Sequence, residues 1–151
     1  MPRNATESRP GVVPQRGELF PTLTGTDRSG TRRSTRDYYM RRNLAVVVVP
    51  PGSEAPDWPA RLTAVRDRVH AEAGEILLVA PQTLPTGDLP AILDDGALAA
   101  KLGLSNRTTP AIFALDRYGL IFATNAAGDS TPDLTPEEIP NWLEFIACRC
   151  T

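Results

Sequence analysis

The sequence has few of the residues that most often carry out chemistry in proteins. Its 151 residues include one histidine, His70, and two cysteines, Cys148 and Cys150. A zinc site with four ligands would need a carboxylate here, and the usual Cys/His spacing is missing. One histidine leaves little room for a Ser-His-Asp triad, and we interpret His70 as a solvated or core-edge side chain. We therefore expect no metal and no cofactor.

Long apolar segments are missing as well. The longest apolar run, Leu44–Val49, is far shorter than the roughly 20 residues that cross a bilayer. Residues 1–10 contain no apolar stretch like that of a secretory signal. Two cysteines close together do not form the disulfide framework of a small secreted protein. These absences predict a cytoplasmic protein without a membrane span.

The charges are nearly balanced in number but not in position. Sixteen basic and eighteen acidic residues give a net charge of −2. Residues 1–43 carry nine arginines and four acidic residues, or +5, whereas residues 44–151 carry seven basic and fourteen acidic residues, or −7. A basic segment therefore precedes an acidic body.

Length and composition predict one folded domain, since the apolar fraction of 41% is ordinary for a globular protein. Residues 1–16 are polar, contain three prolines and show no periodicity. We predict that they form a disordered or draped basic arm, and that residues 17–151 form the domain.

The first half of the domain has a strand–helix–strand pattern. Two apolar runs, 44–49 and 75–80, are typical of strands buried on both faces. A helix capped by Asp57 and ended by Gly74 is expected between them. Its apolar face has helical spacing and consists of Leu62, Val65, Val69 and Ala73. This order predicts a parallel strand pair with a right-handed crossover.

The second half begins with a short helix and continues with a hairpin. Either Asp94 or Asp95 is expected to cap the short helix rather than to form a carboxylate pair. Strands are expected at 110–115 and 120–124, joined by a turn at 116–119.

A final helix is expected from a capping box at Thr135. Its apolar face consists of Ile139, Trp142, Leu143 and Ile146. The whole order predicts an α/β, thioredoxin-like fold, with a central mixed sheet flanked by helices and an irregular N-terminal arm.

Several short motifs resemble the redoxin or peroxiredoxin family, the alkyl hydroperoxide reductase and thiol-specific antioxidant group. Gly17-Glu-Leu-Phe-Pro21 followed by Asp27-x-x-Gly30 resembles the opening of that family. Val46–Val49 with Pro51-Gly52 resembles its first central strand and Pro-Gly segment. Thr109–Gly119 resembles its late strand and hairpin. The resemblance covers residues 17–125 and implies a thioredoxin-like fold.

The sequence departs from the family at the reactive position. Family members carry P-G-x-x-T-x-x-C, whose Cys attacks peroxide, and an Arg near the late strand. Counting from Pro51-Gly52 places Ala55 at the Thr and Trp58 at the Cys, and the Arg falls near Thr109 or Pro110. No cysteine precedes Cys148. Pro110 could fill the structural role of the proline, usually cis, that thioredoxins keep there. Because peroxide reduction needs a thiolate, the residues argue against the family reaction.

Two features leave alternatives open. Trp58 is either an aromatic anchor for a partner or a ring packed at the start of a helix. Cys148 and Cys150 are either a redox or metal-binding pair, with Arg149 favouring the thiolate, or two cysteines without a role. Positions i and i+2 of a helix point apart, so a disulfide between them would require the helix to end there.

A cluster of basic and aromatic residues lies before the first central strand. It could dock on an acidic protein surface, contact nucleic acid, or form a solvated loop. The pI near 5.4 argues against nucleic acid. The members of this basic cluster are Arg32, Arg33, Arg36, Tyr38, Tyr39, Arg41 and Arg42.

Three functions follow from these features. The first is a non-catalytic redoxin-like domain that acts as an accessory or interaction subunit in a protein complex, through the basic cluster and the face around Trp58. The second is a thiol oxidoreductase that uses Cys148 and Cys150. The third is a small-molecule-binding domain that uses the vacated active-site pocket.

Overall fold

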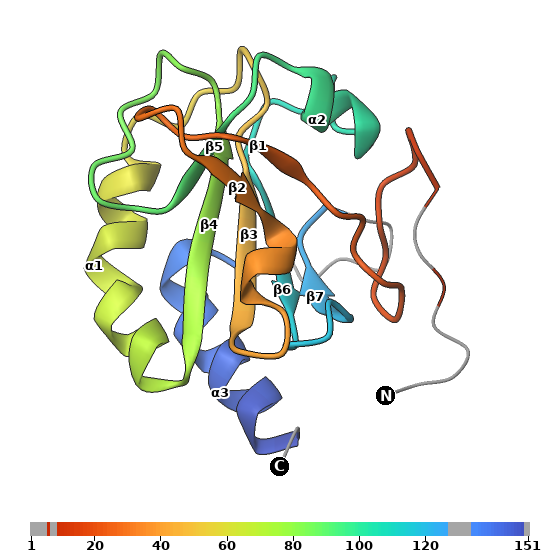
Figure 1. Ribbon diagram of the computed structural model, residues 1–151, viewed down its shortest axis with the longest axis vertical. Helices are drawn as coiled ribbons and strands as arrows, with labels where there is room; N and C mark the ends of the chain where they lie inside the picture. The colour runs from red at the N-terminus through yellow and green to blue at the C-terminus, as the bar shows by residue number, and fades with distance from the viewer. Residues whose placement is uncertain (1–5, 7–8, 127–133, 150–151) are drawn as a thin grey trace.

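The computed structural model describes residue 6 and residues 9–126 and 134–149. Figure 1 shows a central sheet with helices packed around it. The strands are β1 (Thr24–Thr26), β2 (Arg32–Ser34), β3 (Asn43–Val48), β4 (Gly74–Ala80), β5 (Ala91–Leu93), β6 (Ala111–Leu115) and β7 (Ile121–Thr124). The helices are α1 (Trp58–Ala71), α2 (Ala97–Lys101) and α3 (Ile139–Arg149), with 3₁₀ turns η1 (Thr35–Tyr38) and η2 (Pro136–Glu138).

The five-stranded sheet has the order β5-β4-β3-β6-β7. Strands β3 and β4 are parallel and connected through α1, while β6 and β7 form an antiparallel hairpin that pairs with β3. The expected parallel pair, crossover helix and late hairpin are therefore confirmed. The sheet is mixed and central, as the thioredoxin-like prediction requires.

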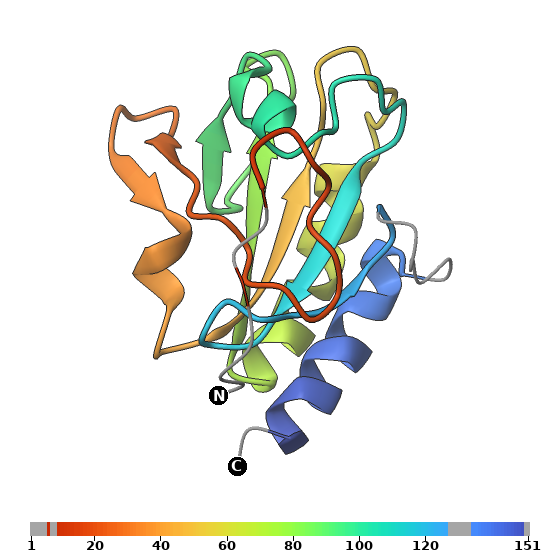
Figure 2. The same ribbon diagram turned by 90° about the vertical axis from the view of Figure 1, so that its right-hand side faces the viewer.

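The two faces of the sheet are covered by different layers, which Figure 2 shows side by side. One face packs against α1 and α3, and its core includes Val47, Leu78 and Leu143. The other face packs against α2 and the segment before β3, with Phe20 and Phe113 in ring contact at 4.9 Å. Every residue of β3 and β4 is buried, and beyond Asn43 and Glu75 at their starts the two strands are unbroken apolar runs.

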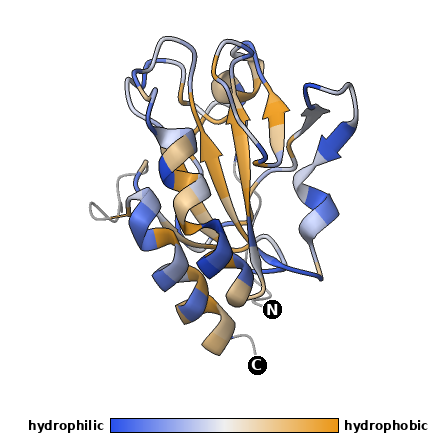
Figure 3. Ribbon diagram, turned by 90° about the vertical axis from the view of Figure 1, so that its left-hand side faces the viewer, coloured by the Kyte–Doolittle hydropathy of each residue, from blue (hydrophilic) through white to orange (hydrophobic). Residues whose placement is uncertain are grey.

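The sequence interpretation missed three short strands. Strands β1 and β2 form a hairpin around the Asp27–Gly30 turn, and β5 adds a parallel edge strand to β4. Gly25 lets the hairpin lie close to β5, because a Cβ there would be 2.6 Å from Cγ2 of Ile92. The hairpin is polar, and Figure 3 shows β2 in blue beside the orange central strands. Three-residue strands are too short for alternation to reveal them.

The ends of α1 differ from the prediction. Asp57 is at the N-cap position but its carboxylate makes no capping hydrogen bond. The helix stops at Ala71, and Ala73 takes the left-handed conformation with φ of 54°. Gly74 is then the first residue of β4, where its small size leaves room for Leu143. Ala73 is consequently not part of the apolar face that Leu62, Val65 and Val69 form, although these three are buried as expected.

The start of the last helix also differs. Thr135 makes no side-chain capping bond, so the expected capping box does not form. Instead, η2 leads directly into α3, with the bidentate Arg61–Glu137 ion pair connecting η2 to α1. Ile139, Leu143 and Ile146 are buried as predicted, and Trp142 is half-buried.

The described part of the N-terminal arm follows the surface of the domain. The amide of Gly11 donates to the Lys101 carbonyl at 2.7 Å, and Pro14 is buried. Residues 17–20 continue along the outer edge of the sheet, where Leu19 bridges to Leu120. Residues 1–5 and 7–8 lie outside the described residues. The boundary between arm and domain at residue 17 stays a prediction.

No helix in the described ranges is both long and apolar enough to span a membrane.

Candidate functional site

A depression of about 430 Å³ lies where the family resemblance places an active site. It is formed by the loops that follow β3 and β4, at the carboxyl ends of two parallel strands, where α/β proteins commonly bind ligands. Its lining consists of Val49, Gly52, Ser53, Glu54, Ala55, Pro56, Pro81, Thr83 and Leu84.

The depression offers little reactive chemistry. Ala55 is 4% exposed and supplies only a methyl group where the family has a threonine hydroxyl. The Ser53 hydroxyl is buried and has no hydrogen-bond partner among the described residues, and Glu54 is exposed. None of these groups is a thiolate, and the described lining holds no cysteine or histidine.

Trp58 is the first residue of α1, at the position that the family motif gives to cysteine. The indole is half-buried, packs against the core beneath α1, and has the Arg61 guanidinium 5.3 Å from its centroid. Arg61 in turn binds Glu137, and this hydrogen bond lowers the pKa of the Glu137 carboxyl. The ring is thus at least partly a packing element, and its role as a partner anchor stays a prediction.

Thr109 and Pro110 precede β6 and do not line the depression. Their loop is nevertheless adjacent to it, because the Glu54 amide donates to the Thr108 carbonyl at 3.3 Å. Thr109 is exposed and Pro110 is buried. The peptide bond before Pro110 is trans, so the usually cis conformation of the corresponding thioredoxin proline is not present here. Of the four family-matched positions, only Ala55 lines the depression.

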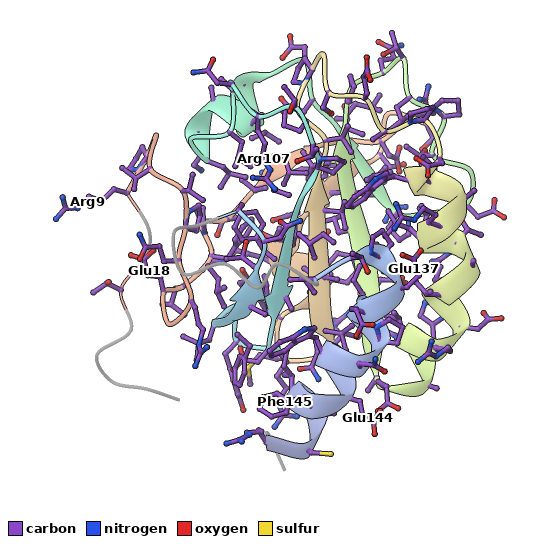
Figure 4. The ribbon with its side chains drawn as sticks, turned by 180° about the vertical axis from the view of Figure 1, so that it is seen from behind. Arg9, Glu18, Arg107, Glu137, Glu144 and Phe145 are labelled. Carbon is purple, nitrogen blue, oxygen red and sulfur yellow. The ribbon has the colours of Figure 1, made fainter. Side chains whose placement is uncertain are left out.

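The sequence interpretation missed Arg107, which Figure 4 labels. Burial lowers the pKa of its guanidinium. Its Nη2 donates to the carbonyls of Pro110 and Asn125, at 3.5 and 3.3 Å, while its buried Nε has no partner among the described residues. Counting from the late strand places the family arginine at Thr109 or Pro110, and nothing in the sequence distinguishes Arg107 from an exposed loop arginine. These hydrogen bonds connect the loop before β6 to Asn125, the residue after β7.

The basic cluster is divided by the fold. Arg33 pairs with Asp27 at 2.9 Å, and Arg42 donates to the Gly74 carbonyl at 3.3 Å. Tyr38 and Tyr39 are half-buried. Arg42 is exposed despite this bond, and the exposed members whose side chains make no hydrogen bond or ion pair with the described residues are Arg32, Arg36 and Arg41. We call these three the exposed arginines, and their docking role stays a prediction.

Asp27 organises the hairpin turn beneath this surface. Its carboxylate accepts hydrogen bonds from the Ser29 hydroxyl at 2.6 Å and from the amides of Ser29 and Thr31. The Ser29 hydroxyl and Arg33 lower the pKa of Asp27 to about 2, against a smaller opposing effect of desolvation. The turn predicted from the sequence is therefore confirmed, and one arginine of the cluster serves it.

The C-terminal cysteine that the structure describes, Cys148, is far from the depression. Cys148 is exposed in the last turn of α3, and Cys150 lies outside the described residues. Figure 1 shows the end of α3 at the opposite end of the molecule from the loops that follow β3 and β4. A thiol at Cys148 therefore does not replace a cysteine in the family position. A redox or metal role for the pair stays a prediction.

His70 is an exposed side chain at the rim of an ion cluster centred on the buried Glu75. Its Nε2 lies 3.0 Å from Oε2 of Glu75, and Arg66 binds the same carboxylate through Nε and Nη2, each at 3.1 Å. Burial by itself would raise the pKa of Glu75, but the bonds from Arg66, the Ile76 amide and His70 outweigh it and lower that pKa. The core-edge interpretation of His70 fits this placement.

Asp94 serves the backbone at the start of α2. Gly96 occupies the N-cap position, but the Asp94 carboxylate accepts hydrogen bonds from the amides of Leu98 and Ala99 at 3.0 Å each, so it satisfies the first turn as expected, whereas Asp95 is exposed. Among the residues that the structure describes, no three histidine, cysteine or acidic side chains gather where they could hold a metal ion.

The fold is shared with known thiol proteins. No family model and no curated protein matches the sequence. A thiol:disulfide interchange protein from Bacteroides sp. superposes with a TM-score of 0.64 at 16% identity, covering 86% of this chain and 88% of its own. AhpC of Mycobacterium tuberculosis gives 0.62 at 17% identity, covering 87% and 92%.

A third structure, the peroxidoxin BcpB of Mycobacterium tuberculosis, gives a TM-score of 0.64 at 14% identity, covering 85% of this chain and 96% of its own. At such identities the similarity establishes the fold and no activity. The chain thus has the thioredoxin-like fold, in the form that thiol:disulfide oxidoreductases and peroxiredoxins also adopt.

Proposed function

We propose that this protein is a redoxin-like domain of the cytoplasm that works by binding a protein partner and not by thiol chemistry at the site where its structural neighbours are expected to react. One observation carries the proposal: the loop after β3 and the start of α1 keep the shape of the fold but present Ala55 and Trp58. A methyl group and an indole cannot attack a peroxide or a disulfide. The domain would then act as an accessory subunit of a complex.

The exposed arginines are the proposed contact. They extend from β2 and η1 and from the turn before β3, over a body whose own charge is negative. Guanidinium groups without an internal ion pair are available to a partner's carboxylates, and such surface charges govern association rate and specificity. A partner with an acidic docking surface fits this arrangement.

A second candidate is thiol chemistry at the C-terminal end of α3. It is favoured by the exposure of Cys148, by Arg149 beside it, and by a fold shared with thiol proteins. A third candidate is a small molecule bound in the depression next to Ala55, where the buried Ser53 hydroxyl is the polar group it could engage.

One experiment separates the first two candidates. Peroxide consumption and disulfide reduction are measured for the wild type and for the Cys148→Ser/Cys150→Ser double variant, with a thioredoxin and its reductase as electron donor. We expect no turnover above the uncatalysed rate for either protein, together with co-purification in a larger complex from native cells. Robust turnover that disappears in the double variant would contradict the binding function and establish the second candidate.

A further inference from the structure

An apolar groove of about 470 Å³ lies on another part of the surface, between β7, α3 and the end of the N-terminal arm. Its floor and walls include Leu120, Phe122, Trp142 and Phe145. Phe145 is 42% exposed, one of three large apolar side chains with that much exposure among the described residues. This size and composition match a small-ligand site, in which a mostly apolar lining carries a few polar groups.

The aromatic wall of the groove is ordered by its own contacts. The rings of Trp142 and Phe145 meet edge to face, 5.7 Å apart at 74°. The Arg149 guanidinium lies over the Phe145 ring, 4.5 Å from its centroid. Figure 4 shows Phe145 and Glu144 on opposite sides of α3, and Glu144 lines a different depression with Arg68. The helix therefore presents an aromatic and basic face to the groove.

A second arginine borders the groove on the side of the arm. Arg16 precedes Gly17, whose amide donates to the Ile121 carbonyl at 2.9 Å. The Ile121 amide in turn donates to the backbone carbonyl of Glu18 at 3.0 Å. These backbone bonds hold Arg16 beside β7. Arg16 and Arg149 are thus the charged residues of the groove, and none of the described residues that line it is acidic.

We infer that this groove binds a free amphipathic monocarboxylate, such as a medium-chain fatty acid. The hydrocarbon chain contacts the aromatic wall, where burial of each methylene is favourable, and the carboxylate pairs with Arg16 or Arg149. Charge complementarity selects this occupant, because two guanidinium groups beside an apolar surface disfavour a cationic or purely hydrocarbon ligand. The inference does not depend on the proposed partner binding.

Trp142 makes the test direct, because the chain has two tryptophans and Trp58→Phe leaves Trp142 as the only one. Decanoate is titrated into this variant while tryptophan fluorescence is recorded, with decyltrimethylammonium as the ligand of opposite charge. We expect a saturable change with decanoate and none with decyltrimethylammonium over the same range. An equal response to both, or no saturable response to decanoate, would overturn the inference.

Charge reversal identifies the headgroup site. Arg16→Glu and Arg149→Glu, each in the Trp58→Phe background, should weaken decanoate binding by about tenfold. Arg32→Glu is the matched control, since it makes the same change of charge at an exposed arginine on β2, and it should leave the affinity unchanged. Equal affinity in all three variants would overturn the inference.

Two further measurements exclude other occupants. Sedimentation with vesicles of three parts phosphatidylcholine to one part phosphatidylglycerol should not capture the protein. Light scattering should show no dimer formed through the groove, that is, no dimer in the wild type that is lost in Phe145→Ser. Capture by vesicles without saturable decanoate binding would assign the groove to a lipid surface, and such a dimer would assign it to a second copy of the chain. Either result would replace the fatty-acid ligand.

Discussion

Single residues show most clearly how far side-chain identity determines the chemistry of this domain. Ala55 and Trp58 occupy the positions that the family motif gives to a threonine and a reactive cysteine, and neither side chain supplies a thiolate. Conversely, the polar clusters around Asp27 and Glu75 stabilise the fold. Asp27 holds a turn, and Glu75 binds Arg66 and His70 at the edge of the core.

The first prediction concerns Asp27. Carbon-detected NMR titration should give a carboxyl pKa of about 2, and Ser29→Ala should raise that pKa toward the ordinary aspartate value. The reason is that the Ser29 hydroxyl is the largest of the interactions that stabilise the ionised form. Because the folded pKa is lowered, the turn is stabilised above the ordinary pKa of aspartate and loses this contribution as the pH falls toward 2. An unchanged pKa in Ser29→Ala would contradict the assignment.

The second prediction concerns Glu75. Glu75→Ala should lower the free energy of unfolding by about 2–3 kcal/mol, because it leaves the partly buried Arg66 without its carboxylate. Since the pKa of Glu75 is lowered on folding, the loss should be full above the ordinary glutamate pKa and diminish as the pH falls through the folded value. Urea unfolding at pH 7 measures the loss of stability, and urea unfolding at pH 3 measures how far this loss diminishes in acid.

Asp67→Asn is the control for Glu75, because Asp67 is an exposed carboxylate on α1, the helix that carries Arg66 and His70. Its free energy of unfolding should stay within about 0.5 kcal/mol of the wild type. A Glu75→Ala variant as stable as this control would show that the ion cluster contributes nothing.

At the level of secondary-structure elements, short segments set the shape of the surface over a core of long apolar strands. The β1–β2 hairpin approaches β5 closely because Gly25 has no side chain. The extra η2 turn lets α3 start against α1, where the Arg61–Glu137 pair connects them.

The third prediction tests the hairpin contact. Gly25→Ala should cost about 1–3 kcal/mol of unfolding free energy, because the new methyl group would be 2.6 Å from Cγ2 of Ile92. In an Ile92→Ala background the same substitution should cost much less, since the clashing atom is gone. A double-mutant cycle from urea unfolding measures the coupling. Equal costs in both backgrounds would show that Ile92 does not limit the approach.

At the scale of the whole molecule, Cys148, the depression and the basic surface are separated. Cys148 is at one end, the depression near Ala55 at the other, and the exposed arginines on the layer opposite α1 and α3. A catalyst would need its reactive groups together, whereas a binding domain can use separate surfaces. This separation is why we favour binding over chemistry.

The fourth prediction follows from that charge distribution. Reversing the exposed arginines together (Arg32→Glu, Arg36→Glu and Arg41→Glu) should change the unfolding free energy by no more than about 0.5 kcal/mol per substitution, because none has a structural ion pair. Co-purification of the acidic partner from native cells should be lost. Retained co-purification with intact folding would remove these arginines from the docking surface.

Arg68→Glu is the matched control for the reversal, because Arg68 is an exposed arginine on α1, on the other side of the sheet. Partner recovery should survive this substitution. Its loss would mean that overall charge, and not the hairpin surface, governs the association.

The sequence alone determined the core of the fold and what chemistry is missing. Unbroken apolar runs identified β3 and β4, helical spacing identified α1 and α3, and the absence of cysteine before Cys148 follows from composition. These features are local in the chain, so periodicity and counting reveal them.

Only the tertiary structure decided the short and long-range features. β5 depends on pairing with β4, and the local β1–β2 hairpin lies against β5. Arg33 binds Asp27, six residues away, and Arg107 binds the carbonyl of Asn125, eighteen residues away. The groove beside Phe145 is assembled from three separate parts of the chain. Residue identity sets which interactions are possible, but the partners that realise them are brought together only by folding.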